Sequence, residues 1–275
     1  MSEVFSYSRI GTYLTCPYSY YLTYVDRHDR ENGVYGVLGG KLHEIMEELE
    51  HGKITNEQAL EKWKSEVDYM ELMEELNFPT EKSKLAYLED IELYLEYFTP
   101  IQFGNRKAFV EEHFEIELLD KYKLQGYIDL YIVDEEKKEI EIVDYKTSSK
   151  SSFSKSCMVE KCRQLVLYGM ALEEKYPDYK IVSTNFDMVK YAVVGKKVKE
   201  RKDLSLDELF ESERYFISAE YNDETKKELL DYVRENIDQI TDMKTKSKSA
   251  WRPIKNKFYC VNLCSVSGHC KYCKK

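Results

Sequence analysis

The sequence predicts an α/β sandwich, in which helices flank a central sheet. Apolar runs rich in β-branched and aromatic residues predict three strands at 108–118, 123–133 and 138–147, joined by short turns as an antiparallel meander. A helical pattern at 6–25 precedes them, and another at 155–175 follows. Together with further strand signal after that helix, this order of elements is typical of an α/β fold.

The N-terminal helix expected at 6–25 has a capping serine, Ser6 or Ser8, and an apolar face that includes Ile10 and Tyr13. A glycine-rich stretch at 31–40 follows and predicts a loop. It lacks the spacing of a phosphate-binding P-loop, so we expect no ATP binding.

Helical sequence then continues through most of residues 41–99. A helix at 41–51 carries His43, and 56–99 is helical throughout, so we interpret 44–105 as a helical insertion beside the sheet. The remaining elements are one or two strands at 179–195, a turn at Lys196-Lys197, a helix at 223–243, a linker at 244–249 and a cysteine-rich tail at 250–275.

Composition limits the class of protein. The net charge of −10 and a pI near 5.2 argue against a passive nucleic-acid coat, although an enzyme can hold DNA over a local basic groove. No 18-residue apolar run and no signal peptide are apparent, so we expect a cytoplasmic protein without a membrane span. Seven cysteines, an odd number, favour metal or cluster ligation over a disulfide framework.

Two acids and a lysine form the strongest chemical signal. Asp129 lies inside one apolar strand, and Asp144 closes the next, two residues before Lys146. Carboxylates in core strands carry a desolvation penalty, which a shared divalent metal would offset. Alternation along a strand places Lys146 on the same face as Asp144, beside the developing charge of a reacting phosphate.

With Gln164-x-x-x-Tyr168 added, these residues resemble the PD-(D/E)XK nuclease superfamily, specifically its RecB-like branch. Ser6 to Ile10, with Tyr13 and Cys16-Pro17, is similar to the branch's opening helix, and Gly39-Gly40-Lys41-Leu42-His43 is similar to its Gly-x-x-x-His element. The resemblance implies one nuclease domain over 1–275, with a restriction-endonuclease-like core: a central mixed sheet flanked by helices.

The resemblance also implies roles for individual residues. His43, Asp129, Asp144 and the Tyr145 carbonyl would bind one or two divalent metals, Mg²⁺ or Mn²⁺. Lys146 would orient the attacking water or neutralise charge. The catalytic set would be completed by Gln164 and Tyr168, which position the lysine or the DNA backbone.

The tail, Cys260-x3-Cys264-x5-Cys270-x2-Cys273, could by itself form a four-cysteine zinc site. The resembled family instead uses one cysteine of its first helix and three of its tail for a 4Fe–4S cluster. This implies ligation by Cys16, Cys260, Cys264 and Cys270, with Cys273 as an alternative ligand, and a tail that docks on the N-terminal helix.

The sequence therefore predicts a metal-dependent deoxyribonuclease, an exonuclease acting on single-stranded DNA or duplex ends, in DNA repair or recombination. Any motor would be a separate helicase partner. Two alternatives are a CRISPR-adaptation nuclease working with an integrase, and a DNA-binding module that keeps only the fold. The intact acids and lysine argue against the second.

Overall fold

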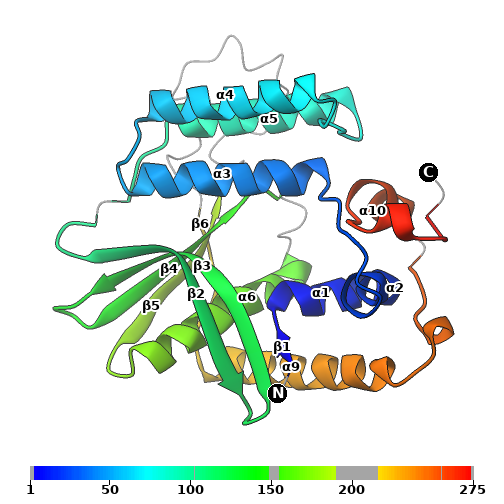
Figure 1. Ribbon diagram of the computed structural model, residues 1–275. Coiled ribbons are helices and arrows are strands. Elements are labelled where there is room, and N and C mark those ends of the chain that lie inside the picture. The colour runs from blue at the N-terminus through cyan, green and yellow to red at the C-terminus, as the bar shows by residue number, and fades with distance from the viewer. Residues whose placement is uncertain (1–2, 102, 149–154, 190–215, 255, 274–275) are drawn as a thin grey trace. The chain divides into compact units, whose positions relative to one another are not determined.

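The computed structural model describes residues 3–101, 103–148, 155–189, 216–254 and 256–273 (Figure 1). The chain forms two compact units, each assembled from segments that are distant in the sequence. Unit 1 comprises 1–37, 113–127 and 222–275, and unit 2 comprises 38–112 and 128–221.

The fold is α/β, with a mixed central sheet flanked by helices. In sequence order the elements are β1 (Val4–Phe5), α1 (Tyr7–Thr15), α2 (Pro17–Tyr20), the π-helical turn η1 (Tyr21–Val25), α3 (Val34–Glu50), α4 (Asn56–Leu72), α5 (Glu81–Glu96), β2 (Lys107–Leu118), β3 (Tyr122–Asp134), β4 (Glu139–Lys146), α6 (Lys155–Lys175), β5 (Lys180–Met188), β6 (Phe216–Ser218), α9 (Asp223–Lys244), η4 (Lys248–Ala250), α10 (Lys257–Asn262) and η5 (Ser267–His269).

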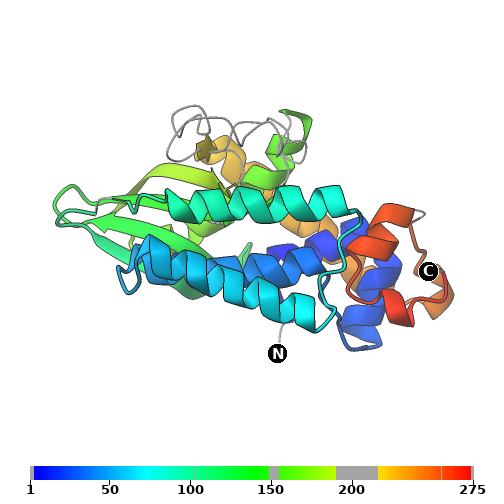
Figure 2. The same cartoon turned by 90° about the horizontal axis from the view of Figure 1, so that it is seen from above.

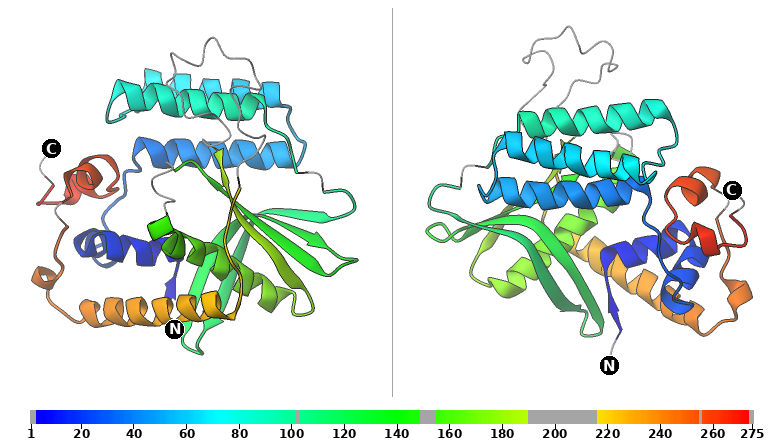
Figure 3. Two further views of the ribbon diagram at one scale, coloured as in Figure 1. Left: turned by 180° about the vertical axis from the view of Figure 1, so that it is seen from behind. Right: turned by 45° about the horizontal axis from the view of Figure 1, so that its top comes forward.

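Unit 2 holds most of the sheet. The strands follow the order β3-β4-β5-β6, with β2 also paired to β3. β4 is antiparallel to β3 and parallel to β5, and β6 is antiparallel to β5, so the sheet is mixed. α6 packs on β4 and β5, the parallel pair whose connection it forms (Figure 3, left). The parallel crossover through a helix is the connection that such a pair requires.

The helical part of unit 2 consists of α3, α4 and α5. α4 and α5 run side by side, as the view from above shows (Figure 2). The N-cap residue of each helix is a threonine, Thr55 for α4 and Thr80 for α5. The threonine side chain and the residue at N3 form a capping box. Trp63 and Ile91, one from each helix, are fully buried. The sequence-based expectation of one helical stretch at 56–99 is replaced by two helices, with the break at residues 73–80.

The start of α3 corrects the expected glycine loop at 31–40, because the helix already begins at Val34 and includes Gly36, Gly39 and Gly40. Its glycines weaken helix formation by about 1 kcal/mol each relative to alanine. Leu38 and Leu42 are nevertheless fully buried, and burying such side chains contributes about 1.5–3 kcal/mol apiece. Tertiary packing therefore outweighs local propensity here.

Unit 1 also departs from the expected single helix at 6–25. The helix is interrupted at Cys16. This residue takes an extended conformation (φ −158°, ψ 103°) because Pro17 disfavours helical backbone in the preceding residue. The Cys16 thiol then accepts a hydrogen bond from the Ser19 backbone N–H and caps α2. The break thus fixes the direction of the Cys16 side chain.

The rest of unit 1 is held by an aromatic core and a short strand pair. β1 pairs in parallel with the beginning of β3, and Tyr7 of α1 contacts Tyr232 of α9 at 5.7 Å between ring centroids. Trp251 is buried and stacks on Tyr20 at 5.8 Å. The expected linker at 244–249 is partly ordered, since α9 continues to Lys244 and η4 follows. The expected strand at 179–195 is β5 as far as 188, and residues 190–195 and Lys196-Lys197 lie outside the described residues.

Candidate metal centre

Asp129 and Asp144 come from neighbouring antiparallel strands of unit 2. The register pairs Leu130 with Val143, so one further step places Asp129 across from Asp144. The described pairing stops before that step, and the backbone N–H of Tyr145 donates a 2.9 Å hydrogen bond to Asp129 Oδ2. The two carboxylates are therefore held together where the strands separate.

Both acids are almost removed from solvent, with exposed fractions of 8 % for Asp129 and 1 % for Asp144. Neither carboxylate oxygen of Asp144 accepts a hydrogen bond of normal geometry from a residue that the structure describes. Its charged contact is an ion pair between Oδ2 and Lys146 Nζ. A buried carboxylate with lone pairs to spare, opposite a second carboxylate, is suited to a bound cation.

Burial and a neighbouring negative charge both affect the pKa of Asp129. Burial first, and then the negative charge of Asp144, raise the pKa of this carboxyl to about 7. The positive charges of His43 and Lys146 oppose that rise but do not cancel it. A divalent cation at this place would stabilise both ionised carboxylates.

Two more potential ligand atoms, from His43 and Glu111, lie close to Asp129. His43, on α3, places Nδ1 3.5 Å from Asp129 Oδ2 and 3.6 Å from Glu111 Oε1. One ligand atom from each of His43, Glu111 and Asp129 lies within 4.8 Å of the others. In an octahedral Mg²⁺ shell, adjacent ligand atoms lie about 3 Å apart and opposite ones about 4.2 Å, so small side-chain movements would complete a site.

Glu111 is the residue that the sequence-based prediction missed. It lies in β2 with a left-handed backbone (φ 50°), a conformation that costs a non-glycine residue about 1–2 kcal/mol. Its carboxylate reaches His43, while the next residue, Glu112, contacts Tyr131 and Lys175. The run Glu111-Glu112-His113-Phe114-Glu115-Ile116-Glu117 contains four glutamates, and no local signal separates one from another.

Lys146 and Tyr168 interact with the acids, and Gln164 contacts Tyr168. The Lys146 ammonium group lies 5.5 Å from the centre of the Phe186 ring as well as beside Asp144. Gln164 Nε2 donates a 2.7 Å hydrogen bond to the Tyr168 hydroxyl, one turn further along α6. Burial, followed by the charges of Asp144 and Asp129, raises the pKa of Tyr168 well above its usual value, so its hydroxyl stays protonated.

The side chain of Tyr145 links β4 to α3. Its hydroxyl donates a 2.6 Å hydrogen bond to the buried Glu50 of α3, and Glu50 also accepts from the Ile101 backbone N–H. The phenol thus ties β4 to α3, the helix that carries His43. All the predicted site residues of unit 2 therefore lie around Asp144 and on the elements that position it.

Comparison with known protein families gives a match over nearly the whole chain. A family model of the PD-(D/E)XK nuclease superfamily matches residues 4–274. The chain belongs to the PD-(D/E)XK nuclease superfamily. Membership in this superfamily implies a metal-dependent nuclease, and the acids of β3 and β4 occupy the strands on which the sequence predicted them.

A solved structure supports the same fold. The crystal structure of a "putative exonuclease" from Eubacterium rectale has a TM-score of 0.50 to this PD-(D/E)XK protein, at 14% identity, over 99% of this chain and 90% of that one. A search of curated protein sequences finds no match. Among the described residues, none of the helices is long and apolar enough to cross a membrane.

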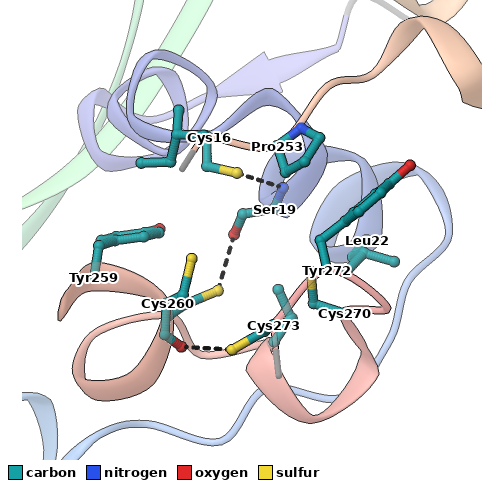
Figure 4. A pocket seen from close by; sticks show the side chains of 12 residues that line it. Cys16, Ser19, Leu22, Pro253, Tyr259, Cys260, Cys270, Tyr272 and Cys273 are labelled. Carbon is teal, nitrogen blue, oxygen red and sulfur yellow. Dashed lines mark hydrogen bonds between the residues drawn. The ribbon is translucent and has the colours of Figure 1, made fainter. Parts of the chain in front are cut away.

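The second group of predicted ligands lies in unit 1. Five cysteines, together with Ser19 and other side chains, line one cavity of about 20 Å³ (Figure 4). The cysteines are Cys16, Cys260, Cys264, Cys270 and Cys273. Burial, followed by the negative charge that the other four cysteines carry as thiolates, raises the pKa of the Cys260 thiol. The described residues contain no disulfide among them.

The metal-free protein should lose stability as the pH rises from about 5.5 to 8. The pKa values of Asp129 and His43 are both raised in the fold: burial lowers that of His43, but Glu111 and the aspartates offset this. Protonation of these two groups stabilises the folded state fully at pH values below their pKa values in the unfolded chain. This stability is lost as the pH rises through their pKa values in the folded protein, about 7 for Asp129.

Melting curves with EDTA across this pH range would check the expectation. Asp129→Asn keeps an acceptor for the Tyr145 N–H and should flatten the profile. Mn²⁺ should stabilise the parent more at pH 8 than at pH 5.5, because the ion must displace protons. A pH profile of Asp129→Asn that matches the parent would contradict the assignment.

Glu111→Gln should weaken Mn²⁺ binding by at least about tenfold, since ligands and their close partners typically contribute 10–100-fold to metal affinity. Isothermal titration calorimetry of the metal-free protein measures this directly. Glu136→Gln, in the exposed turn between β3 and β4, is the matched control and should bind as the parent does. Equal affinity of the two variants would remove Glu111 from the metal site.

Proposed function

We propose that this nuclease is an exonuclease that hydrolyses phosphodiester bonds of single-stranded DNA or duplex ends, in a cytoplasmic repair or recombination pathway. The observation that carries the catalytic part is the buried pair Asp129 and Asp144, with Lys146 beside it. Burying two carboxylates side by side is costly unless a cation compensates them. Lys146 is placed to do so in part, and a bound divalent ion would complete the compensation. An intact set of this kind favours an enzyme over a DNA-binding module that keeps only the fold.

His43, Asp129 and Asp144 would hold Mg²⁺ or Mn²⁺, with the Tyr145 carbonyl as a further ligand. When bound, the ion lowers the pKa of a water and offsets the charge of the reacting phosphate. Lys146 would orient the attacking water or neutralise charge on the phosphate. Its ion pair with Asp144 fixes the ammonium group at that position.

Gln164 and Tyr168 would act on the DNA side of the site. Their mutual hydrogen bond leaves the Gln164 carbonyl oxygen as an acceptor and orients its amide group. Because Tyr168 remains protonated, its hydroxyl can donate a hydrogen bond to an anionic oxygen. A helicase partner would be needed for processive unwinding, and an integrase partner would instead place the protein in CRISPR adaptation.

The proposal includes a 4Fe–4S cluster held by Cys16, Cys260, Cys264 and Cys270, with Cys273 as an alternative ligand. Its support is the convergence of thiols from α2's N-cap and from the tail on one cavity. Soft thiolates of this number bind iron–sulfur clusters or zinc. A cluster with this ligand set would cross-link the two ends of unit 1.

Asp144→Ala and Lys146→Ala should each reduce cleavage at least about a hundredfold, the typical loss when one group that stabilises a transition state is removed. Lys82→Ala, at an exposed position of α5, is the control. The assay uses 5′- and 3′-labelled single-stranded, duplex and circular DNA with Mn²⁺. Cleavage of circles would contradict the exonuclease part, and near-parental turnover of either variant would contradict the site.

Protein purified without oxygen should be brown and contain about four irons per chain. Cys16→Ser should lose the iron and lower the melting temperature, because the cluster closes a long loop. Cys273→Ser should keep the iron content and the melting temperature of the parent. The opposite pattern, with one zinc that survives Cys16→Ser but not Cys273→Ser, would show that the tail alone forms a zinc site.

A further inference from the structure

Charge is distributed very unevenly along this acidic chain. Residues 244–275 contain nine Lys and Arg and no Asp or Glu, although at the average of 51 acids in 275 residues this stretch would hold about six. Residues 56–96, which cover α4 and α5, contain twelve acids and four Lys. The tail is therefore the basic part of a protein with a net charge of −10.

Some of the basic side chains of the tail are already neutralised. Lys244, Lys246 and Lys248 form ion pairs with Glu3, Asp242 and Asp26, respectively. Arg252, Lys257 and Lys271 are exposed, and no ion pair joins them to an acid among the residues that the structure describes. These three cations are free to bind an anionic partner.

Two aromatic rings are exposed in the same segment. Phe258 is 54% exposed and Tyr272 is 52% exposed, although large aromatic side chains are usually buried. The Lys271 ammonium group lies 4.9 Å from the centre of the Tyr272 ring. The Tyr272 ring also contacts the Tyr18 ring edge to face, at 5.0 Å between centroids, which helps to hold it in place.

Tyr272 lines the cysteine cavity, and each of the other four residues lies one or two positions from a cavity-lining residue in the sequence. Pro253, Tyr259, Cys270 and Tyr272 all line it, and Figure 4 shows them on its rim. Arg252 precedes Pro253, Lys257 and Phe258 precede Tyr259, and Lys271 lies between Cys270 and Tyr272. We call Arg252, Lys257, Phe258, Lys271 and Tyr272 the tail surface.

We propose that the tail surface binds single-stranded DNA, with its cations on phosphates and its rings on unpaired bases. Exposed aromatic rings among unpaired cations are what sequence-independent single-strand binding requires, because every base has a face that can stack. A duplex offers its phosphates but not its base faces. The inference depends on the proposed function only for the choice of DNA as the nucleic acid.

The test measures the fluorescence anisotropy of labelled dT20 with the iron-loaded full chain in EDTA, so that binding is separated from cleavage. The triple variant Arg252→Gln, Lys257→Gln and Lys271→Gln should bind at least about tenfold more weakly at about 0.1 M salt. Its slope of log affinity against log salt should fall by about 2, since each phosphate contact to a single strand contributes about 0.7. Phe258→Leu, which keeps apolar bulk but removes the ring, should bind about fivefold more weakly or worse.

The matched control replaces three lysines at the acidic end of the charge distribution. Lys53→Gln, Lys64→Gln and Lys82→Gln remove the same charge from exposed positions and should leave the affinity within about twofold. Iron content and melting temperature report whether each variant has kept its fold. Since the substituted side chains are exposed, both should match the parent.

Equal affinities of the tail and control variants would overturn the inference. A 20-base-pair duplex provides the second arm: equal losses on duplex and dT20, with no effect of Phe258→Leu, would overturn the single-strand assignment. Failure of the nuclease proposal is distinguishable, because a parent chain that binds dT20 but cuts no DNA with Mn²⁺ contradicts the proposed function and leaves the tail surface standing.

Discussion

The repulsion between Asp129 and Asp144 is the constraint around which unit 2 is organised. Two carboxylates on adjacent strands, both nearly excluded from water, resist ionisation together, and the raised pKa of Asp129 records this. The surrounding residues each reduce the cost in part: Lys146 by its charge, the Tyr145 N–H by a hydrogen bond, and His43 by its imidazole. A divalent ion would remove the remaining repulsion, so the stability of the metal-free protein and its affinity for a metal should depend on the same atoms.

Secondary structure supplies the precision that this pair requires. The β3–β4 register places the acids opposite each other, and the parallel partner β5 holds β4 from the other side. α3 is fixed to β4 by the bond from Tyr145 to Glu50, which lies two turns of helix beyond His43. A substitution at Glu50 would therefore shift His43, which lies on the same helix, although Glu50 is not itself one of the candidate metal ligands.

Unit 1 brings together cysteine sulfur atoms, where unit 2 brings together carboxylates. Its sulfur atoms surround a cavity between the N-terminal helices and the tail, and backbone contacts such as the 2.7 Å bond from Glu31 N–H to the Ser265 carbonyl hold these segments together. Ser19 touches both sides, since its N–H donates to Cys16 and its hydroxyl lies 3.6 Å from the Cys264 sulfur. The tail segment that contributes four of these cysteines also carries exposed cations and two exposed aromatic rings.

The sequence by itself determined the α/β class, the strands that carry Asp129 and Asp144, the helix that carries Gln164 and Tyr168, and the superfamily. The class and the elements depend on alternation and helical periodicity, which are local, whereas the superfamily was indicated by the resemblance of the motifs to a known family. Only the tertiary structure decided that Gly36, Gly39 and Gly40 are helical, because buried leucines outweigh their poor propensity. It also decided which glutamate of β2 meets His43, since a left-handed backbone at Glu111 is stabilised by surroundings that no local pattern encodes.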